Sequence, residues 1–352
     1  MAIPVERTRT PRPRTRDEDL GFGKHFTDHI FRLDWDEGKG WHSARVVPYA
    51  PIAVDPAASA LHYGQSIFEG MKAFPAKGGG IAVFRPRAHA ARLARSARRL
   101  AMPEPPEDLF LEGVRTLLHE DASFMPQAPG TSLYVRPLLF ATEPFLGVRP
   151  SKQYALLVMI SPVGTYFSGP PRPLKLWVEQ DGARAAKGGL GAAKAAANYA
   201  ASLLAAEEAK ARGFDQVLWL DAAERRWVEE IGTMNMFAKI GGRVVTPALG
   251  GTILAGVTRD CVIALCRRMG LEVEERRLSI DELKAAHRAG TLEELFGTGT
   301  ASLALAIGEL AFGNERLVLA QPPAPLSARL RDDLAAIQRG EAEDTFGWLE
   351  KM

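Results

Sequence analysis

Apolar and polar positions in the first half of the chain predict a mixture of strands and helices. The apolar run at 81–84 is typical of a strand, and the segment 85–102 is typical of a helix that a proline ends. A second helix is predicted over 109–119. The run 131–140 predicts an apolar strand with one polar interruption, at Arg136.

The second half of the chain continues with strands and helices. The apolar run at 154–161 predicts a buried strand. A loop rich in Gly and Ala at 182–193 precedes a helix that extends to about Arg212, where Gly213 suits the C-terminal cap. The remaining predicted elements are a strand at 216–221, a hairpin of 236–240 and 243–247 with a Gly-Gly turn, helices at 257–269 and 327–339, and helix starts at two capping boxes, 279–282 and 291–294.

This irregular order favours an α+β fold over a doubly wound sheet, because no regular strand–helix–strand rhythm is present. The 352 residues suffice for two domains. The stretch at 143–153 contains Pro and Gly without a hydrophobic period, so we expect an interdomain loop there, between a small α/β domain at 21–142 and a large domain at 154–352. Residues 1–20, rich in Arg, Thr and Pro, are expected to form a flexible extension.

Composition narrows the classes of function. A formal net charge of +2, with 24% charged residues, gives no general preference for nucleic acid or membranes. Cys261 and Cys266 cannot supply a disulfide framework and are expected to be core thiols. No apolar run approaches the roughly 20 residues of a membrane span, and the charged N-terminus is not followed by the apolar segment of a secretory signal. We therefore expect a cytoplasmic protein without a membrane partner.

Three features could carry other chemistry. The helix at 85–102 contains six arginines that could bind nucleic acid, although charges at helical spacing are more often a solvated face. The run 188–195 has alanines where a nucleotide-phosphate loop needs Gly before its lysine and Ser or Thr after it. His25 and His29 are spaced to ligate a metal from one helix face, but no third ligand is evident, so we expect no metal site.

Nine segments, in the same order as in a known family, carry a specific resemblance. They are FTDH at 26–29, LHYGQSIFEGMKAF at 61–74, FRP at 84–86 with RLARSARRLAMP at 92–103, SLYVRPLLFATEPFLGV at 132–148, PVGTYF at 162–167, GAAKAAANYAASLL at 191–204, EEIGTMNMF at 229–237, LAGVTRD at 254–260 and FGTGTAS at 296–302. From about Phe22 to the last helix, the chain resembles the branched-chain amino acid aminotransferases. These are fold-type IV enzymes with two domains like those of D-amino acid aminotransferase, so the resemblance implies pyridoxal 5'-phosphate as cofactor.

The resemblance also implies which residues would hold that cofactor. Lys194, in the segment KAAANY, would form the imine with the cofactor aldehyde and, once displaced by substrate, would move the proton during transfer. Glu230 would keep the pyridine nitrogen protonated, with Glu229 as the adjacent alternative. Tyr199 would donate a hydrogen bond to the ring oxygen. The phosphate residues implied by the family are Arg92, Val257, Thr258 and Thr300.

A substrate pocket is implied in the same way. It must accept an apolar side chain in one half-reaction and the distal carboxylate of glutamate in the other. Arg136, alongside Tyr134, would bind that carboxylate, while Leu146 and Val148 would close over the side chain. The substrate residues that the resemblance implies are Phe26, Tyr63, Phe68, Tyr134, Arg136, Tyr166, Thr300 and Ala301.

The implied activity is reversible transfer of the amino group of L-Leu, L-Ile or L-Val to 2-oxoglutarate, by a homodimer whose partner subunit completes the pocket. A D-amino acid aminotransferase or an aminodeoxychorismate lyase of the same fold remains an alternative, although YVRP at 134–137 and the aromatic pocket speak against both. Outside enzymes, the alternative is a protein that binds nucleic acid through its Arg-rich helix.

Overall fold

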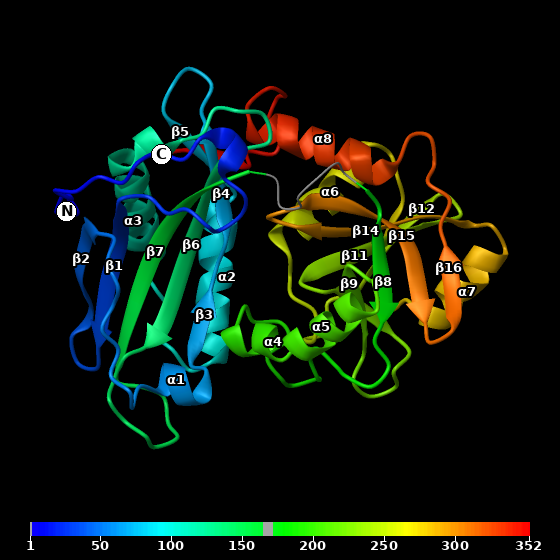
Figure 1. The fold of residues 1–352 in the computed structure, drawn as a ribbon, viewed down its shortest axis with the longest axis horizontal. Helices are drawn as coiled ribbons and strands as arrows, with labels where there is room; N and C mark the ends of the chain where they lie inside the picture. The colour runs from blue at the N-terminus through cyan, green and yellow to red at the C-terminus, as the bar shows by residue number, and fades with distance from the viewer. Residues whose placement is uncertain (1, 165–171) are drawn as a thin grey trace. The chain divides into compact units, whose positions relative to one another are not determined.

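The computed structural model in Figure 1 describes residues 2–164 and 172–352. The chain forms two compact units. Unit 1 consists of residues 1–168, 193–197 and 336–352, and unit 2 consists of residues 169–192 and 198–335. Unit 1 is therefore assembled from three separate stretches of the chain.

Unit 1 is organised around an antiparallel sheet. Its strands are β1 (His29–Asp36), β2 (Gly40–Pro48), β3 (Ser66–Phe68), β4 (Met71–Pro75), β5 (Ile81–Phe84), β6 (Ser132–Ala141), β7 (Gln153–Val163) and β17 (Leu349–Lys351). They run in the order β17-β5-β4-β6-β7-β1-β2, with β3 paired to β6. The strands predicted at 81–84, 131–140 and 154–161 are confirmed. Because β7 pairs with both β6 and β1, the expected interdomain loop at 143–153 lies inside unit 1 instead of dividing the units.

Three α-helices belong wholly to unit 1: α1 (Ser59–Tyr63), α2 (Pro86–Arg99) and α3 (Glu107–Glu120), with short 3₁₀ turns at Asp17–Asp19 and Ala122–Phe124. Both longer helices confirm the predictions for 85–102 and 109–119. The buried side of α2 carries Leu93 and Ala97, as an amphipathic helix requires. The same buried side carries three polar residues, His89, Arg92 and Ser96. Buried polar side chains need hydrogen-bond partners, so these three indicate a polar site on the side of the helix that faces the protein.

The first twenty residues differ from the expected flexible extension. Val5 forms a parallel bridge with Val46 of β2, and the amide of Glu6 donates to the Val46 carbonyl at 2.9 Å. Further along, the amide of Thr8 donates to Nε2 of His29 at 3.0 Å. High charge and proline content predicted disorder, but these backbone groups find hydrogen-bond partners on β1 and β2.

The two histidines that were weighed as metal ligands and set aside do not lie on one helix. His29 is the first residue of β1 and His25 precedes that strand, so the two do not share a helix face. Nδ1 of His29 lies 2.7 Å from a carboxylate oxygen of Asp121, and both side chains are buried. Within residues 2–164 and 172–352, no group of three or more His, Cys, Asp or Glu could hold a metal ion, and no helix is long and apolar enough to cross a membrane.

Unit 2 contains the second sheet. Its strands are β8 (Leu174–Val178), β9 (Gln216–Leu220), β10 (Val228–Ile231), β11 (Met234–Ile240), β12 (Arg243–Pro247), β13 (Val273–Arg276), β14 (Leu292–Gly299), β15 (Leu303–Phe312) and β16 (Glu315–Val318). The order is β10-β9-β8-β15-β14-β11-β12-β13, and β16 pairs with β15. In addition, β10 pairs directly with β11. The strands β10, β9, β8, β15, β14 and β11 therefore form a closed ring. The predicted hairpin of β11 and β12 is confirmed.

The remaining helices are α4 (Ala196–Ala200), α5 (Leu203–Ala211), α6 (Val257–Arg268), α7 (Ile280–Arg288) and α8 (Leu326–Gln338). The single helix expected up to Arg212 is divided into α4 and α5. Ser279 caps α7 as predicted, since its hydroxyl accepts from the Glu282 amide at 3.0 Å. The second capping box, at 291–294, is wrong, because Gly290 ends α7 directly before it and β14 follows.

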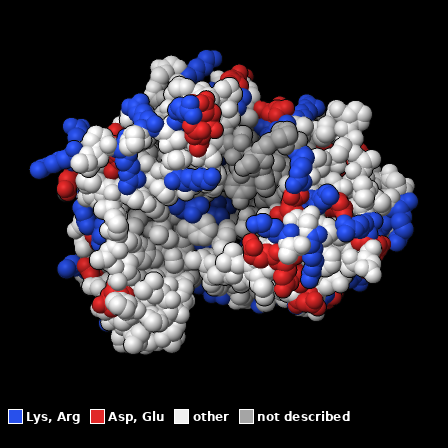
Figure 2. All heavy atoms as spheres, in the orientation of Figure 1, with Lys and Arg blue, Asp and Glu red and all other residues white. Residues whose placement is uncertain are grey.

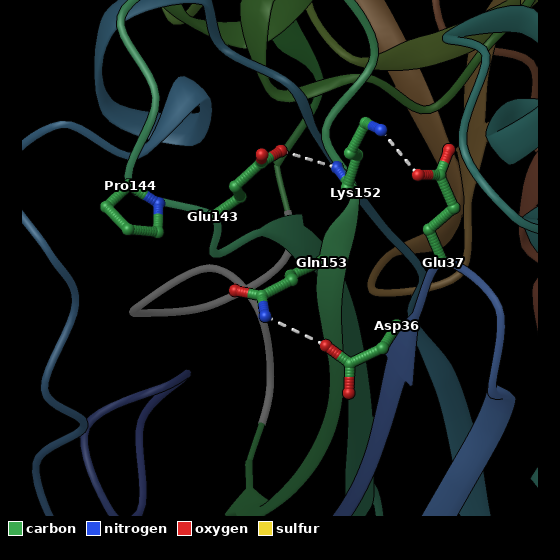
Figure 3. Close-up of a pocket in the computed structure, with 6 residues that line it drawn as sticks. All are labelled: Asp36, Glu37, Glu143, Pro144, Lys152 and Gln153. Carbon is green, nitrogen blue, oxygen red and sulfur yellow. Dashed lines mark hydrogen bonds and ion pairs between the residues drawn. The ribbon is translucent and has the colours of Figure 1, made fainter.

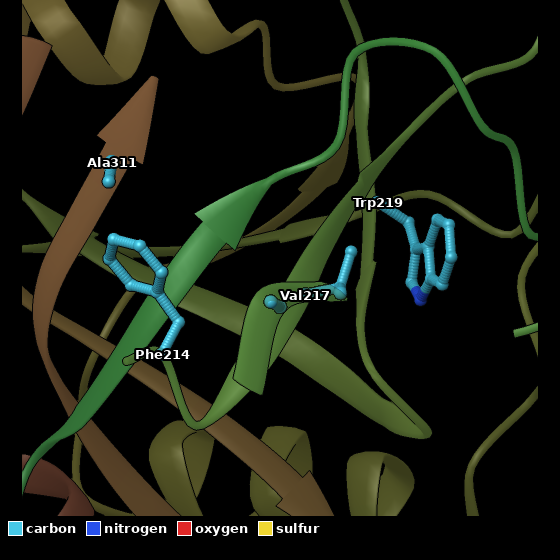
Figure 4. Packing of buried hydrophobic residues seen from close by; sticks show 5 residues of the cluster. Phe214, Val217, Trp219 and Ala311 are labelled. Carbon is cyan, nitrogen blue, oxygen red and sulfur yellow. The ribbon is translucent and has the colours of Figure 1, made fainter. Parts of the chain in front are cut away.

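Apolar packing in unit 2 explains why α5 lies on β9. Figure 4 shows Phe214, which follows α5, pointing toward Ala311 of β15. Val217 and Trp219 of β9 belong to the same buried cluster, which Ala209 of α5 completes. Elsewhere in the unit, the two cysteines are free and buried as expected.

Candidate active site

Lys194 is held through its backbone by two elements of unit 1. The amide of Phe68, at the end of β3, donates to the Lys194 carbonyl at 3.1 Å, and Ile67 forms a bridge with Ala195. From the other side, the Lys194 amide donates to the hydroxyl of Ser96 on α2 at 3.0 Å. The position of this lysine is therefore fixed by hydrogen bonds to β3 and α2.

The Lys194 side chain lies where burial and a nearby cation disfavour its charged form. Its Nζ is 4.8 Å from the centre of the Phe68 ring. Burial and the nearby charge of Arg92 lower the pKa of Lys194 to about 8, although Glu69 acts in the opposite direction. A lysine of ordinary pKa, about 10.4, is almost entirely protonated at neutral pH, so this environment makes the amine more available as a nucleophile and a base.

Arg92 is part of a buried charge network beside Lys194. Its Nε and Nη2 donate to the two carboxylate oxygens of Glu69 at 2.6 and 2.9 Å, and Nδ1 of His89 lies 2.9 Å from the same carboxylate. Burial opposes ionisation of Glu69, but the charge and hydrogen bonds of Arg92 and His89 hold its pKa well below the usual value. Burial lowers the pKa of His89, which favours the neutral ring. The network is thus an ion pair supported by an imidazole.

A second cation of unit 1 lies among aromatic rings. The guanidinium of Arg136 is 4.9 Å from the centre of the Phe68 ring, and its Nη2 donates to the Tyr134 hydroxyl at 3.2 Å. Tyr134 in turn packs edge-on against Phe22, with ring centres 5.0 Å apart. Gly70 makes room for this arrangement, because a Cβ there would lie 1.8 Å from the Tyr134 hydroxyl. Among the residues implied for substrate, Phe68, Tyr134 and Arg136 are therefore brought together.

Other residues implied for substrate have different surroundings. Phe26 packs against Tyr49, with ring centres 5.2 Å apart. Tyr63 is 48% exposed, and its hydroxyl donates to the Leu146 carbonyl at 2.5 Å. Tyr166 lies outside the described residues.

Glu230 of unit 2 is buried in a second ion pair. Its carboxylate lies 2.5 Å from Nε of Arg184, and both side chains are almost inaccessible. The Arg184 guanidinium is anchored by the carbonyls of Thr252 and Gly191, at 2.9 and 3.4 Å. On the other carboxylate oxygen, Glu230 accepts from the Leu254 amide at 3.1 Å. Arg184 thus fixes the orientation of a buried carboxylate.

Strand pairing places two more polar side chains in a row with Glu230. Glu230 pairs with Asn235 on β11, and Asn235 pairs with Thr298 on β14. Nδ2 of Asn235 donates to Glu230 at 3.2 Å, and the hydroxyl of Thr298 is buried with no hydrogen-bond partner among the described residues. Gly256, which precedes α6, lies against Asn235, since a Cβ there would be 2.0 Å from the Asn235 side-chain oxygen. The first turn of α6 is therefore next to this polar row.

The structure distinguishes Glu230 from its neighbour Glu229. Both are buried in β10, where successive side chains point to opposite faces. Burial raises the pKa of Glu229, whereas Glu230 forms an ion pair with the guanidinium of Arg184. Of the two, Glu230 is therefore the carboxylate that forms the ion pair with Arg184, and a carboxylate is the form that holds a proton on a pyridine nitrogen.

The donors in each unit fit pyridoxal phosphate chemically. Unit 1 offers a lysine amine of lowered pKa and a buried guanidinium, and unit 2 offers a buried carboxylate and the Thr298 hydroxyl. Val257 and Thr258 are the first two residues of α6, and the amides of a helix's first turn can bind a phosphate. Three further expected residues are only partly buried: Tyr199 in α4, and Thr300 and Ala301 in the turn between β14 and β15.

Sequence analysis missed Glu69, His89, Arg184 and a second buried lysine, Lys72. Burial lowers the pKa of Lys72 to about 8 as well. His89, Arg92 and Ser96 are spaced at three and four residues, and this spacing could have indicated one polar face of the helix. Arg184 lies in a Gly/Ala-rich loop without periodicity, so no local pattern identifies it.

A separate hollow of unit 1, with a volume of about 440 Å³, contains none of these residues. Figure 3 shows that each of its carboxylates lies against a neighbouring group of the hollow. Nζ of Lys152 is 2.5 Å from Glu37, the Lys152 amide donates to Glu143 at 2.6 Å, and Gln153 donates to Asp36 at 2.9 Å. The carboxylates of this hollow thus already have partners within unit 1.

Comparisons with known proteins agree with this chemistry. The family model described as amino-transferase class IV matches residues 66–310. The chain is 47% identical over 353 residues to branched-chain-amino-acid aminotransferase 2 of Bacillus subtilis (strain 168), covering 100% of this chain and 97% of that protein. The solved branched-chain amino acid aminotransferase of Escherichia coli is 28% identical with a TM-score of 0.75, covering 91% of this chain and 98% of that one. The T.th. enzyme of the same name, solved with pyridoxamine 5'-phosphate, is also 28% identical, with a TM-score of 0.72 and coverage of 91% and 98%.

The α+β fold, the lysine of lowered pKa in unit 1 and the buried arginine–carboxylate pair in each unit thus agree with a match over most of the chain. The chain belongs to the class IV aminotransferases and, within them, to the branched-chain-amino-acid aminotransferases.

Proposed function

We propose that this chain transfers the amino group of L-Leu, L-Ile or L-Val to 2-oxoglutarate, reversibly, with pyridoxal 5'-phosphate as cofactor. The observation that supports this most directly is Lys194, a lysine with a pKa of about 8, held by backbone hydrogen bonds near an arginine. When bound, the cofactor accepts the electrons released at Cα of the amino acid and carries the amino group between the half-reactions. The residues of this chain position the reactants and move the proton.

Each residue has a proposed task. Lys194 attaches the cofactor and then moves the proton at Cα of the substrate through its Nζ. Glu230 holds the pyridine nitrogen in its charged form, and Tyr199 donates to the ring oxygen. The phosphate is bound by Arg92, Thr300 and the first turn of α6, at Val257 and Thr258.

The substrate residues are proposed on the same basis. Arg136 and Tyr134 lie within hydrogen-bond distance of each other, so a distal carboxylate could bind both. Phe68 provides an apolar wall, because its ring centre lies 4.9 Å from the Arg136 guanidinium and 4.8 Å from Nζ of Lys194. The remaining proposed substrate residues are Phe26, Tyr63, Tyr166, Thr300 and Ala301.

The first test is the visible absorption spectrum of the purified protein before and after addition of L-leucine. We expect a cofactor band in the visible range that L-leucine converts to the pyridoxamine form. The variant Lys194→Ala should lose turnover almost completely, whereas Lys187→Ala, on an exposed lysine nearby, should keep it. Near-normal turnover of Lys194→Ala would refute the assignment. A band that responds only to D-amino acids would redirect the function to a D-amino acid aminotransferase.

We also propose that the enzyme is a homodimer. In unit 1, α1 and the loop after β6 expose apolar side chains, with Leu61, Leu146 and Val148 at 62%, 61% and 85% exposure. The hydrogen bond between Tyr63 and Leu146 joins these segments, and the corresponding surface in Figure 2 is largely uncharged. An exposed apolar surface of this kind is typical of an interface, and a second copy would cover it.

The dimer is tested by light scattering. We expect twice the chain mass for the wild type and a shift toward the monomer for Val148→Asp, with a raised KM because the partner would contribute to the pocket. Val318→Asp, on an exposed valine of unit 2, is the matched control. A wild-type protein with the mass of one chain would refute the dimer.

For location we propose the cytoplasm. Cys261 and Cys266 are both free thiols, as is usual in a reducing compartment. Cell fractionation with immunodetection tests this proposal.

A further inference from the structure

Beyond the residues assigned above, Glu69 has a position that a purely structural side chain does not need. It follows β3 directly, and its neighbour Phe68 donates to the Lys194 carbonyl. The Glu69 amide donates to the Pro137 carbonyl at 2.9 Å, which fixes its backbone against β6. Its side chain is completely buried. The residue thus lies between the segment of Lys194 and the sheet of unit 1.

The carboxylate of Glu69 joins this backbone framework to α2. It accepts from both Nε and Nη2 of Arg92 and lies 2.9 Å from Nδ1 of His89. Ser96, one turn beyond Arg92 on the same buried face, accepts from the Lys194 amide. The ion pair therefore fixes the helix that also holds the lysine, and it fixes Arg92 in one orientation.

The carboxylate of Glu69 also affects the pKa of the Lys194 amine. The charged and titratable groups that act most strongly on the pKa of this amine are Arg92 from α2, Glu69 after β3, and Tyr134 and Arg136 from β6, and the charge of Lys194 also acts on His89 of α2. Both arginines lower the pKa of Lys194 and Glu69 raises it, and burial of His89 favours its neutral ring. Without Glu69, the positive charge of Arg92 would act on the amine uncompensated.

We propose that Glu69 is a positioning residue for the reaction: it holds Arg92 in place for an anion and balances the Arg92 charge beside Lys194. This inference rests on the proposed roles of Lys194 and Arg92. It adds that the protonation of Lys194 depends on the charges of both Arg92 and Glu69.

The test measures Lys194 directly in the cofactor-free protein. Competitive acetylation over a pH series, read by peptide mass spectrometry, gives the pH at which Lys194 is half reactive. For Glu69→Gln we expect this midpoint to fall by on the order of one pH unit, because an anion near the amine is lost. For Arg92→Gln we expect it to rise. The double variant, which removes both charges, should return close to the wild type.

This readout separates positioning from a structural role. If Glu69→Gln merely loosened unit 1, the amine would become exposed and its midpoint would rise toward about 10.4. An unchanged or raised midpoint in Glu69→Gln would therefore overturn the proposal. Lys72 is an internal control in the same digest, because burial alone lowers its pKa, and its midpoint should not move.

Two further measurements complete the experiment. Glu143→Gln is the matched control, since Glu143 also pairs with an arginine, Arg149, but away from Lys194. It should leave the Lys194 midpoint unchanged, and an equal shift there would refute the specific role of Glu69. Binding of pyridoxal phosphate, followed by fluorescence, should weaken at least tenfold in Glu69→Gln and much less in Glu69→Asp, which keeps the charge. Because acetylation needs no cofactor, its outcome stands even if the aminotransferase assignment fails.

Discussion

The two units of this protein contain the same buried pair of side chains, used in opposite ways. In unit 1, Arg92 is the proposed ligand and the carboxylate of Glu69 supports it. In unit 2, the carboxylate of Glu230 is the proposed ligand and Arg184 supports it. A bound phosphate needs a cation and a pyridinium nitrogen needs an anion, so each ligand requires an opposite charge to keep it ionised in a buried place. The residue that supports each ligand is therefore as specific as the ligand itself.

The largest expected effect is the loss of kcat when the charge of Glu230 is removed. Glu230→Gln removes the charge that holds the pyridine nitrogen in its protonated form, so we expect kcat to fall by at least about a hundredfold, as for other buried groups that stabilise charge in a transition state. Steady-state kinetics with L-leucine and 2-oxoglutarate measure this. Glu229→Gln should change kcat little, because successive side chains of β10 point to opposite faces and Glu229 therefore faces away from the position of Glu230. Equal losses in both variants would remove the distinction between the two residues.

A smaller effect, on stability, is expected from the supporting arginine. Arg184→Met leaves the buried Glu230 charge without its guanidinium, so the free energy of unfolding should fall by about 3–5 kcal/mol. Urea unfolding of the cofactor-free protein, followed by circular dichroism, measures the loss. The double variant Arg184→Met with Glu230→Leu should recover most of it, since a buried pair can be replaced by apolar side chains at little cost. If the double variant were as unstable as the single one, Arg184 would act through packing and not through charge.

The smallest expected effect depends on pH and concerns Lys72 of unit 1. Its pKa is about 8 in the folded chain and about 10.4 when unfolded. Between these values the unfolded chain binds more protons, so this lysine makes stability rise with pH across the window. Lys72→Met removes the cost of burying a charge, and we expect it to stabilise the protein by about 1–3 kcal/mol below pH 8. The gain should shrink toward pH 10, as urea unfolding at several pH values would show, and a gain independent of pH would contradict the assigned cause.

Much of the fold was accessible from local patterns. The strands around 81–84 and 154–161 and the helices α2, α3 and α6 follow hydrophobic periods that tertiary contacts do not override. The segment 291–294 has the letters of a capping box, yet it forms β14, and the Glu294 carboxylate accepts from the amides of Leu326 and Ser327 at the start of α8. A local motif does not show that its glutamate accepts hydrogen bonds from the start of a helix about thirty residues later in the chain.

The site residues also fall into two groups: those that the sequence identifies and those that only the folded chain shows. Lys194, Arg92 and Glu230 stand in distinctive segments, so resemblance to a family could select them. The partners of Arg92 and Glu230 come from 23 residues earlier in one case and from a loop without a pattern in the other, and only the folded chain shows them. For the N-terminal residues, composition alone predicted a flexible extension. Composition does not show that Val46 of β2 is a hydrogen-bond partner for them.

The pairing of β17 with β5 has a consequence for how the protein is made. Residues 349–351 follow unit 2 in the chain but form the strand beside β5 in unit 1, and the amide of Arg85, just before α2, donates to the Trp348 carbonyl at 2.6 Å. A ribosome therefore releases all of unit 2 before it delivers the strand that completes the sheet of unit 1. Until then, the edge of β5 is open, and a nascent chain stalled before residue 348 would carry the Lys194 segment beside an unfinished sheet.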